Sequence, residues 1–164
     1  MEIRYGQIED AESLALAIQN VEDSGFMLFN PGERQLTKEG AESLLKVLSK
    51  EPNAVIVAVH ENRVHGYLFI KGETVSRVKH RASIAVGGVC DFARKQGIAQ
   101  KMFAKAHLFA AEREIHRLQI SVIATNEPAI RLYEKMGYVR EGIYKDAIYM
   151  NGSYVDELVL AKLK

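Results

Sequence analysis

Two tight turns between β-prone runs constrain the fold of this chain more than any other feature of its sequence. The turn at residues 61–63 separates the runs at 54–60 and 64–74, and Asn151-Gly152 precedes another run at 154–162. Both arrangements are typical of antiparallel hairpins. Because helical segments lie between the hairpins, the sequence predicts an α+β domain and argues against a doubly wound parallel sheet.

The rest of the chain alternates between helical and strand patterns. Leu14, Ala15, Ile18 and Val21 fall on one helical face, which predicts an amphipathic helix from about residue 10 to residue 21. The other expected elements are a strand near 2–5, a helix from a Thr37 N-cap to about 49, a strand at 80–90 with a bulge or close backbone approach at Gly87-Gly88, helices at 97–115 and 128–136, a strand at 118–123, and a strand from Tyr138.

Composition limits the classes of protein to consider. The length of 164 residues with 48% hydrophobic residues predicts a single domain over 1–164, and a net charge of +1 argues against a nucleic-acid partner. No apolar run reaches the ~18 residues of a membrane span, and the N-terminus does not resemble a signal peptide, so we expect a cytoplasmic protein. With Cys90 as the sole cysteine and no ligand spacing among the histidines, we expect no metal.

The segment from Val89 to Ala99 carries the first chemical signal. A strand ends at Val89, the basic pair Arg94-Lys95 follows, and a helix begins near Gly97. The first amides of a helix have no intrahelical acceptors and carry the positive end of its dipole, so they can bind a pyrophosphate. Taken alone, this pattern also fits an ordinary helix start with solvated basic residues. It is neither a Walker loop nor a dinucleotide fingerprint, which argues against ATP and NAD.

A second segment makes the pattern specific. Asn126 is followed by Ala129 and then by Leu-Tyr-Glu-Lys-Met-Gly-Tyr over residues 132–138. Together with the loop at 94–99, this segment resembles the signature of the GNAT N-acetyltransferases, and the resemblance is strongest over residues 54–140. It implies a mixed, mostly antiparallel central sheet of about seven strands flanked by four helices, with a splayed strand pair that holds acetyl-CoA.

The resemblance also implies a function and a site. The activity would be transfer of an acetyl group from acetyl-CoA to a primary amine, such as a small amine or a protein N-terminus, by direct attack in a ternary complex. Tyr133 would stand near the thioester sulfur as the catalytic acid, whereas the alternative is that Tyr133 only packs on the sheet. The residues expected to contact the cofactor are Val89, Arg94, Lys95, Gln96, Gly97, Ile98, Ala99, Gln100, Asn126 and Tyr133.

The general base and the acceptor site are less defined. The expected strand at 80–90 carries no Asp or Glu, unlike GNAT members with a glutamate there, so candidate bases come from other segments. By the same likeness, the acceptor would enter between the loop at 22–35 and the last hairpin, where carboxylates and aromatic rings favour a cationic amine. The candidate acceptor residues are Phe26, Glu33, Asp146 and Asp156, each of which also fits an ordinary surface position.

Two alternatives stay open. One is a non-catalytic acyl-CoA-binding regulatory module, which an intact tyrosine at position 133 argues against. Another is a transferase for a different acyl group, which the volume of the site near the thioester would decide. In either case the exposed edge of the last hairpin is compatible with a homodimer.

Overall fold

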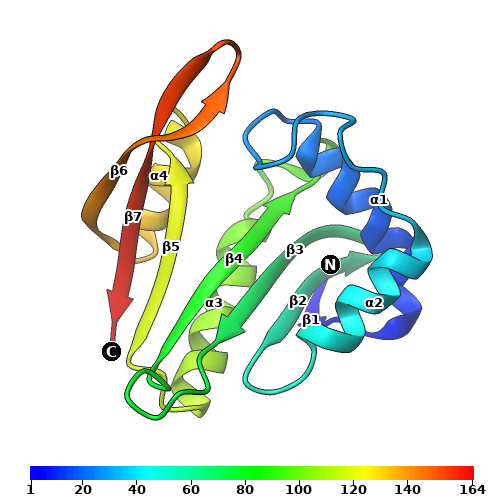
Figure 1. The fold of residues 1–164 in the computed structure, drawn as a ribbon. Helices are drawn as coiled ribbons and strands as arrows, with labels where there is room; N and C mark the ends of the chain where they lie inside the picture. Colours follow the sequence, from blue (N-terminus) through cyan, green and yellow to red (C-terminus); the bar gives the residue numbers. More distant parts are fainter.

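A seven-stranded sheet organises the chain, and the computed structural model describes all of residues 1–164 (Figure 1). The strand order is β1-β2-β3-β4-β5-β7-β6. The strands are β1 (Glu2–Tyr5), β2 (Ala54–His60), β3 (Arg63–Gly72), β4 (Arg81–Val89), β5 (Arg117–Ile123), β6 (Val139–Met150) and β7 (Ser153–Leu163). The α-helices are α1 (Ala11–Glu22), α2 (Lys38–Leu48), α3 (Ile98–Glu112) and α4 (Glu127–Lys135).

All neighbouring strands are antiparallel except β4 and β5, so the predicted mixed, mostly antiparallel sheet with four helices is confirmed. The parallel pairing covers only Arg81–Ile84 of β4 against Arg117–Ile120 of β5. Beyond this point β5 continues along β7, whereas β4 continues along β3. Figure 1 shows the two strands side by side at one end and well separated at the other.

An irregularity in β4 coincides with this separation. Phe69 pairs with Val86 and Ile70 pairs with Ile84, so Ala85 is an extra residue on β4. Such a bulge bends a strand and increases its local twist. Pairing with β5 stops at Ile84, one residue before the bulge, and the remaining part of β4 turns away from β5.

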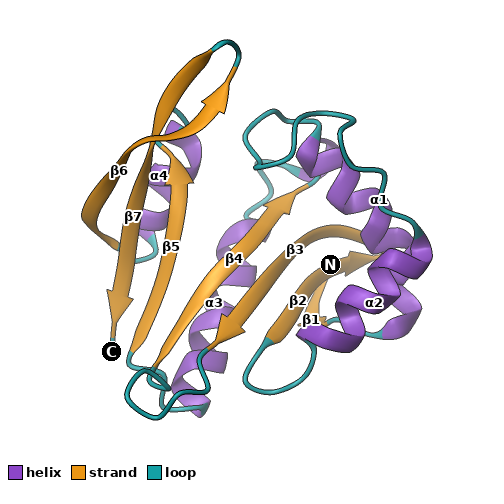
Figure 2. Ribbon diagram, in the orientation of Figure 1, coloured by secondary structure: helices purple, strands orange, loops and turns teal.

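Helices cover both faces of the sheet (Figure 2). A Cβ placed on Gly66 of β3 would meet Met102 of α3, whereas one placed on Gly88 of β4 would meet Val21 of α1. The residue opposite Gly88 is Tyr67, which follows Gly66 and therefore points to the other face. Helix α3 thus packs on one face of β3, and the C-terminal end of α1 packs on the opposite face.

Local sequence explains where the helices begin and end. The Thr37 hydroxyl accepts a hydrogen bond from the Gly40 amide and caps α2, as predicted. Helix α3 ends at Glu112, earlier than the predicted residue 115, because Glu114 adopts a left-handed conformation with φ +55°. The Ile115 amide then bonds to the Ala110 carbonyl, a Schellman ending that apolar periodicity does not reveal.

The glycine pair in β4 has a different role from a bulge. The bulge lies at Ala85 and not at Gly87-Gly88, whereas the alternative expectation, a close approach of another backbone, is met at Gly87, where a Cβ would lie 2.8 Å from the Tyr67 carbonyl oxygen. A Cβ on Gly87 would lie 2.2 Å from Cδ2 of Leu68, and a Cβ on Gly88 would lie 2.4 Å from Cγ1 of Val21. The glycines therefore leave room for neighbouring side chains on the two faces of the strand.

None of the helices combines the length and apolar composition needed to cross a membrane.

Replacing Gly88 by alanine should destabilise the protein, because the new methyl group would push the end of α1 away from β4. The expected loss is about 1–3 kcal/mol of unfolding free energy, measured by urea denaturation. Gly142→Ala is the matched control, since its Cβ would meet nothing within 4 Å. Equal stability of the two variants would contradict the packing described here.

Candidate functional site

The separation of β4 from β5 brings two helix-forming segments to opposite sides of one opening in the sheet. Strand β4 ends at Val89 and leads through residues 90–97 to the N-terminus of α3. Strand β5 ends at Ile123 and leads to α4 (Figure 1). The motif residues of both segments therefore follow strand ends that no longer hydrogen-bond to each other.

The N-terminus of α3 presents backbone amides that have no partner. None of the N–H groups of residues 96–100 donates a hydrogen bond within the protein, and the first bond of the helix runs from Lys101 to the Gly97 carbonyl. Gly97 adopts a left-handed φ of +73°, and a Cβ placed there would meet nothing within 4 Å. No acidic residue lies in the first turn of α3. This end of the helix can therefore accept an anion such as a pyrophosphate.

The basic residues before α3 have distinct conformations. Arg94 is exposed and its Nε donates a 3.2 Å hydrogen bond to the Val89 carbonyl, which ties the loop to the end of β4. Lys95 is exposed and adopts a left-handed φ of +61°. The predicted cofactor residues of this segment, from Val89 to Gln100, thus lie on one continuous loop and helix start.

Helix α4 carries the second group of predicted residues. Oδ1 of Asn126 accepts a 3.4 Å hydrogen bond from the Ala129 amide and caps the helix. At the other end Gly137 has φ +91°, as expected for the residue that stops the helix, and the Tyr138 amide bonds to the Tyr133 carbonyl. Both helix ends are thus fixed, which sets the position of Tyr133 about 1.7 turns after the first residue of the helix.

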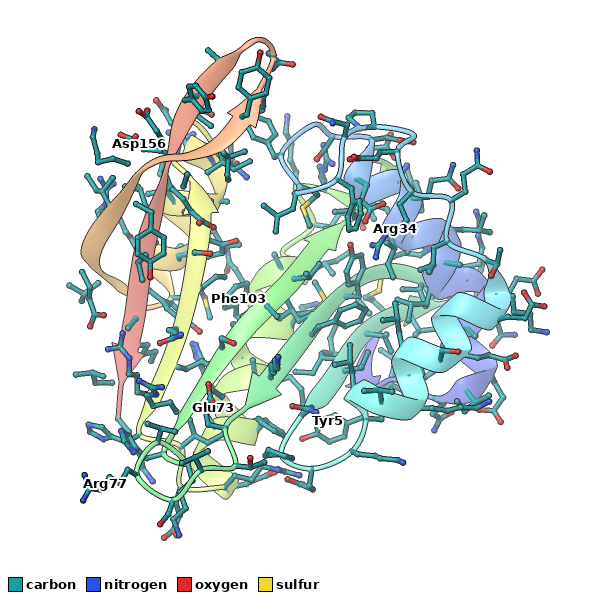
Figure 3. The ribbon with its side chains drawn as sticks, viewed as in Figure 1. Tyr5, Arg34, Glu73, Arg77, Phe103 and Asp156 are labelled. Carbon is teal, nitrogen blue, oxygen red and sulfur yellow. The ribbon has the colours of Figure 1, made fainter.

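Tyr133 lies in an aromatic cluster between α3 and α4. Its ring centroid is 5.4 Å from Phe103 and 6.2 Å from Tyr138, and Phe103 lies next to the strands in Figure 3. Burial raises the pKa of Tyr133 to about 12, so its phenol stays protonated at neutral pH. No hydrogen-bond acceptor within the protein takes this proton. A neutral, packed phenol with a free proton is suited to act as a general acid.

The acceptor candidates form contacts within their own segments. Oε2 of Glu33 accepts a 2.7 Å hydrogen bond from the Asn30 amide, and Phe26 is 41% exposed in the same loop. Asp156 binds Nζ of Lys145 at 2.7 Å and the Asp146 amide at 3.0 Å on the last hairpin. The carboxylates of Glu33 and Asp156 thus stabilise their own loop and hairpin in this structure. The role of all four residues in acceptor binding stays a prediction.

Sequence reasoning missed a buried polar cluster formed by Glu22, Arg34 and Tyr67. Glu22 is the last residue of α1, is 4% exposed and forms an ion pair with Arg34. A signal existed, because Glu22 follows Ile18 by four residues and so lies on the apolar face of the helix. Tyr67 is completely buried, and its hydroxyl has no hydrogen-bond partner.

Cys90 is packed in the core beside this region. It is 1% exposed, and burial raises the pKa of its thiol to about 11, with a smaller contribution from the charge of Asp91. A thiol that stays protonated at neutral pH is a poor nucleophile.

The structure contains no group of three or more His, Cys, Asp or Glu side chains that could hold a metal ion.

Comparison with known proteins identifies the class. Residues 4–159 match the family model of the GNAT acetyltransferase domain, which is most of the chain. The chain therefore belongs to the GNAT family of acetyltransferases, whose members use acetyl-CoA.

Individual relatives extend this result. The L-amino acid N-acetyltransferase AaaT of Escherichia coli strain K12 is 30% identical over 112 residues, which are 66% of this chain and 67% of the relative. A ribosomal-protein-alanine N-acetyltransferase from Brucella melitensis has the same fold, with a TM-score of 0.88, 24% identity and all of both chains covered. The protein yncA from Salmonella typhimurium, solved with its cofactor acetyl-CoA, has a TM-score of 0.84 at 15% identity, covering 99% of this chain and 92% of that chain.

The aromatic cluster predicts an acid-sensitive contribution from His107. Burial, aided by the charge of Lys162, lowers the pKa of His107 from 6.5 to about 4, and its Nε2 lies 3.3 Å from the Tyr138 hydroxyl. Below pH 6.5 the unfolded chain therefore binds a proton that the folded protein excludes until about pH 4. Because His107 is only half-buried, solvent screening reduces the effect, and stability should fall by about 1–2 kcal/mol across this window.

Urea denaturation at several pH values should show a shallower decline between pH 6.5 and 4 for His107→Gln than for the wild-type protein. Titration of the His107 ring by NMR gives its pKa directly. A midpoint near 6.5 would contradict the burial of this side chain in the cluster.

Proposed function

We propose that this chain is an N-acetyltransferase that moves an acetyl group from acetyl-CoA to a primary amine in a ternary complex. The observation that carries the proposal is the opening between β4 and β5, with unpaired amides of residues 96–100 on one side and the protonated phenol of Tyr133 on the other. An anion site and an acid on either side of one opening suit a thioester cosubstrate with a pyrophosphate.

The residues present fit acetyl-CoA, which supplies the activated acetyl thioester when bound. The amides of residues 96–100 would bind the pyrophosphate, and Arg94 and Lys95 would add positive charge. The end of β4 at Val89 would contact the pantetheine arm through its backbone. Asn126 would contact the arm from the α4 side, since its side-chain amide nitrogen donates no hydrogen bond in the protein.

Tyr133 would protonate the departing sulfur. As the amine nitrogen bonds to the acetyl carbon, the carbon–sulfur bond breaks. The nitrogen gives a proton to solvent water, the sulfur takes the proton of Tyr133, and Tyr133 regains a proton from solvent. A tyrosine phenol carries its proton at neutral pH even at its ordinary pKa of 10, and the rise of the Tyr133 pKa on burial does not remove that proton. Cys90 does not compete as an acyl carrier because its thiol is buried and protonated, which favours direct transfer to the amine.

The proposal that the acceptor is a primary amine is supported by the names of two similar proteins, which differ in the amine that they specify. One relative is named for L-amino acids and another for an alanine of a ribosomal protein, so both a small amine and a protein N-terminus stay candidates. A regulatory acyl-CoA-binding module and a transferase for another acyl group are the alternatives. Self-association through the exposed edge strand β6 is a further expectation.

Calorimetric titration tests cofactor binding. Acetyl-CoA and CoA should each bind to one site per chain, whereas ATP should not bind, because the loop before α3 lacks a Walker sequence. Gly97→Ala should weaken both CoA interactions, since alanine disfavours the φ of +73° at the start of the helix. Failure of folded wild-type protein to bind acetyl-CoA would refute the proposal.

Tyr133→Phe tests the acid. With a panel of amines, kcat should fall about 100-fold or more, while acetyl-CoA affinity stays close to that of the wild-type protein. Tyr5→Phe is the matched control, because Tyr5 lies on β1 at a distance from α4 (Figure 3). An unchanged kcat for Tyr133→Phe would remove Tyr133 from the chemistry and leave it a packing role. Acetyl-CoA binding without acetylation of any amine by the wild-type protein would favour the regulatory module.

A further inference from the structure

The buried cluster beneath the α1–α2 segment is built around a carboxylate with a single partner. Glu22 is 4% exposed, and Arg34 is the only residue that donates a hydrogen bond to it, through Nη2. A buried charge needs a counter-charge, since an unpaired carboxylate in the interior is strongly unfavourable. Glu22 is therefore stabilised in its charged form by a cationic partner, which Arg34 supplies in this structure.

Arg34 is an incompletely bound cation. Its Nε is buried without a hydrogen-bond partner, and its guanidinium lies 4.3 Å from the centre of the Phe29 ring. The side chain reaches Glu22 from the segment between α1 and α2, after a turn closed by the bond from the Asn30 amide to Glu33. Arg34 thus enters the cluster from a surface segment, in the way that a ligand would.

Tyr67 supplies a second unpaired polar group at the same place. It is opposite Gly88 in the β3–β4 pairing, and Gly88 contacts Val21, the residue before Glu22. Because paired residues of antiparallel strands share a face, Tyr67 lies beneath the last turn of α1. Burial raises the pKa of Tyr67, and the negative charge of Glu22 raises it further, so the two groups are within electrostatic reach.

The cluster also lies at the end of β4 that leaves β5. Gly88 precedes Val89, whose carbonyl binds Arg94 before α3 begins. Figure 3 shows Arg34 where the α1–α2 segment passes the ends of β3 and β4. An amine held here would be at the strand end proposed for the pantetheine arm. Strand β4 itself carries no Asp or Glu, and Glu22 supplies a carboxylate from α1.

We propose that Glu22 binds the ammonium group of the acceptor, with the Tyr67 hydroxyl as a second hydrogen-bond partner, and that Arg34 occupies this position in the free protein. The inference deepens the proposed function by naming the group that selects the acceptor. Exchange of one cation for another keeps Glu22 paired, whereas an uncharged acceptor would leave the carboxylate without a counter-charge. The site therefore selects cationic amines over alcohols of the same shape.

An NMR titration with propylamine tests the exchange, with 1-propanol as the uncharged probe, at pH 7 and without any nucleotide. Arg34→Met should bind propylamine about tenfold more tightly than the wild-type protein, because the competing guanidinium is gone. Adding Glu22→Gln to that variant should abolish the binding, and 1-propanol should bind to neither. Matched controls are Arg77→Met and Glu73→Gln, which lie at the opposite end of the molecule in Figure 3 and form no ion pair.

The second variant is Arg34→Lys, which keeps a cation at this position if Arg34→Met does not fold. Its single ammonium should compete less well than the guanidinium, so propylamine should bind about threefold more tightly than to the wild-type protein. Equal affinity in the wild-type and Arg34 variants, or binding that survives Glu22→Gln, would overturn the inference. A parallel titration with acetyl-CoA separates the two proposals. Failure of acetyl-CoA to bind would refute the proposed acetyltransferase activity, whereas the propylamine titration tests only whether Glu22 binds an ammonium group.

Discussion

The loss of pairing between β4 and β5 is the constraint on which the rest of the candidate site depends. The two strands are parallel neighbours for four residue pairs and then separate at the extra residue Ala85. Each strand keeps its other neighbour, so the backbone beyond Ile84 stays ordered by β3, and that beyond Ile120 stays ordered by β7. A break in one hydrogen-bonded ladder therefore opens the sheet without loosening either half.

The opening explains how two motifs that are far apart in the sequence come to lie near each other in the fold. The chain leaves β4 into the N-terminus of α3 and leaves β5 into α4, so an anion-binding helix end and a protonated phenol come from separate crossovers. Both helices also contact each other through Phe103 and Tyr133. Packing of this aromatic pair makes the position of Tyr133, the proposed acid, depend on the same helix that offers the amides.

Polar groups are treated differently on the two faces of the sheet. On the α3 side the candidate residue Tyr133 packs among aromatic rings, and burial raises its pKa to about 12. On the α1 side the interior holds Glu22, which depends on a cation supplied by a surface segment. The side proposed for the cofactor thus presents its amides and phenol without internal partners, whereas Glu22 is held by Arg34, which reaches it from a surface segment.

Local patterns in the sequence determined much of the fold. The hairpin turns, the Thr37 cap, the Gly137 stop and the two motif segments depend on near neighbours in the chain, and the structure bears out the elements that they predict. The bulge at Ala85 and the end of α3 at Glu114 were not predicted from the sequence, because neither position has a residue type that is typical of such a feature. The contacts of Gly87 and Gly88 also required the structure, since Leu68 and Val21 come from other elements.

What the sequence by itself determined is the family signature, the order of the elements and the residues expected to meet acetyl-CoA, since these follow from short-range spacing. Only the tertiary structure decided that Glu22 is buried against Arg34, that the Tyr67 hydroxyl is unpaired beside them, and that the pKa of Tyr133 is raised. These properties depend on burial and charge, which arise when segments far apart in the chain pack together.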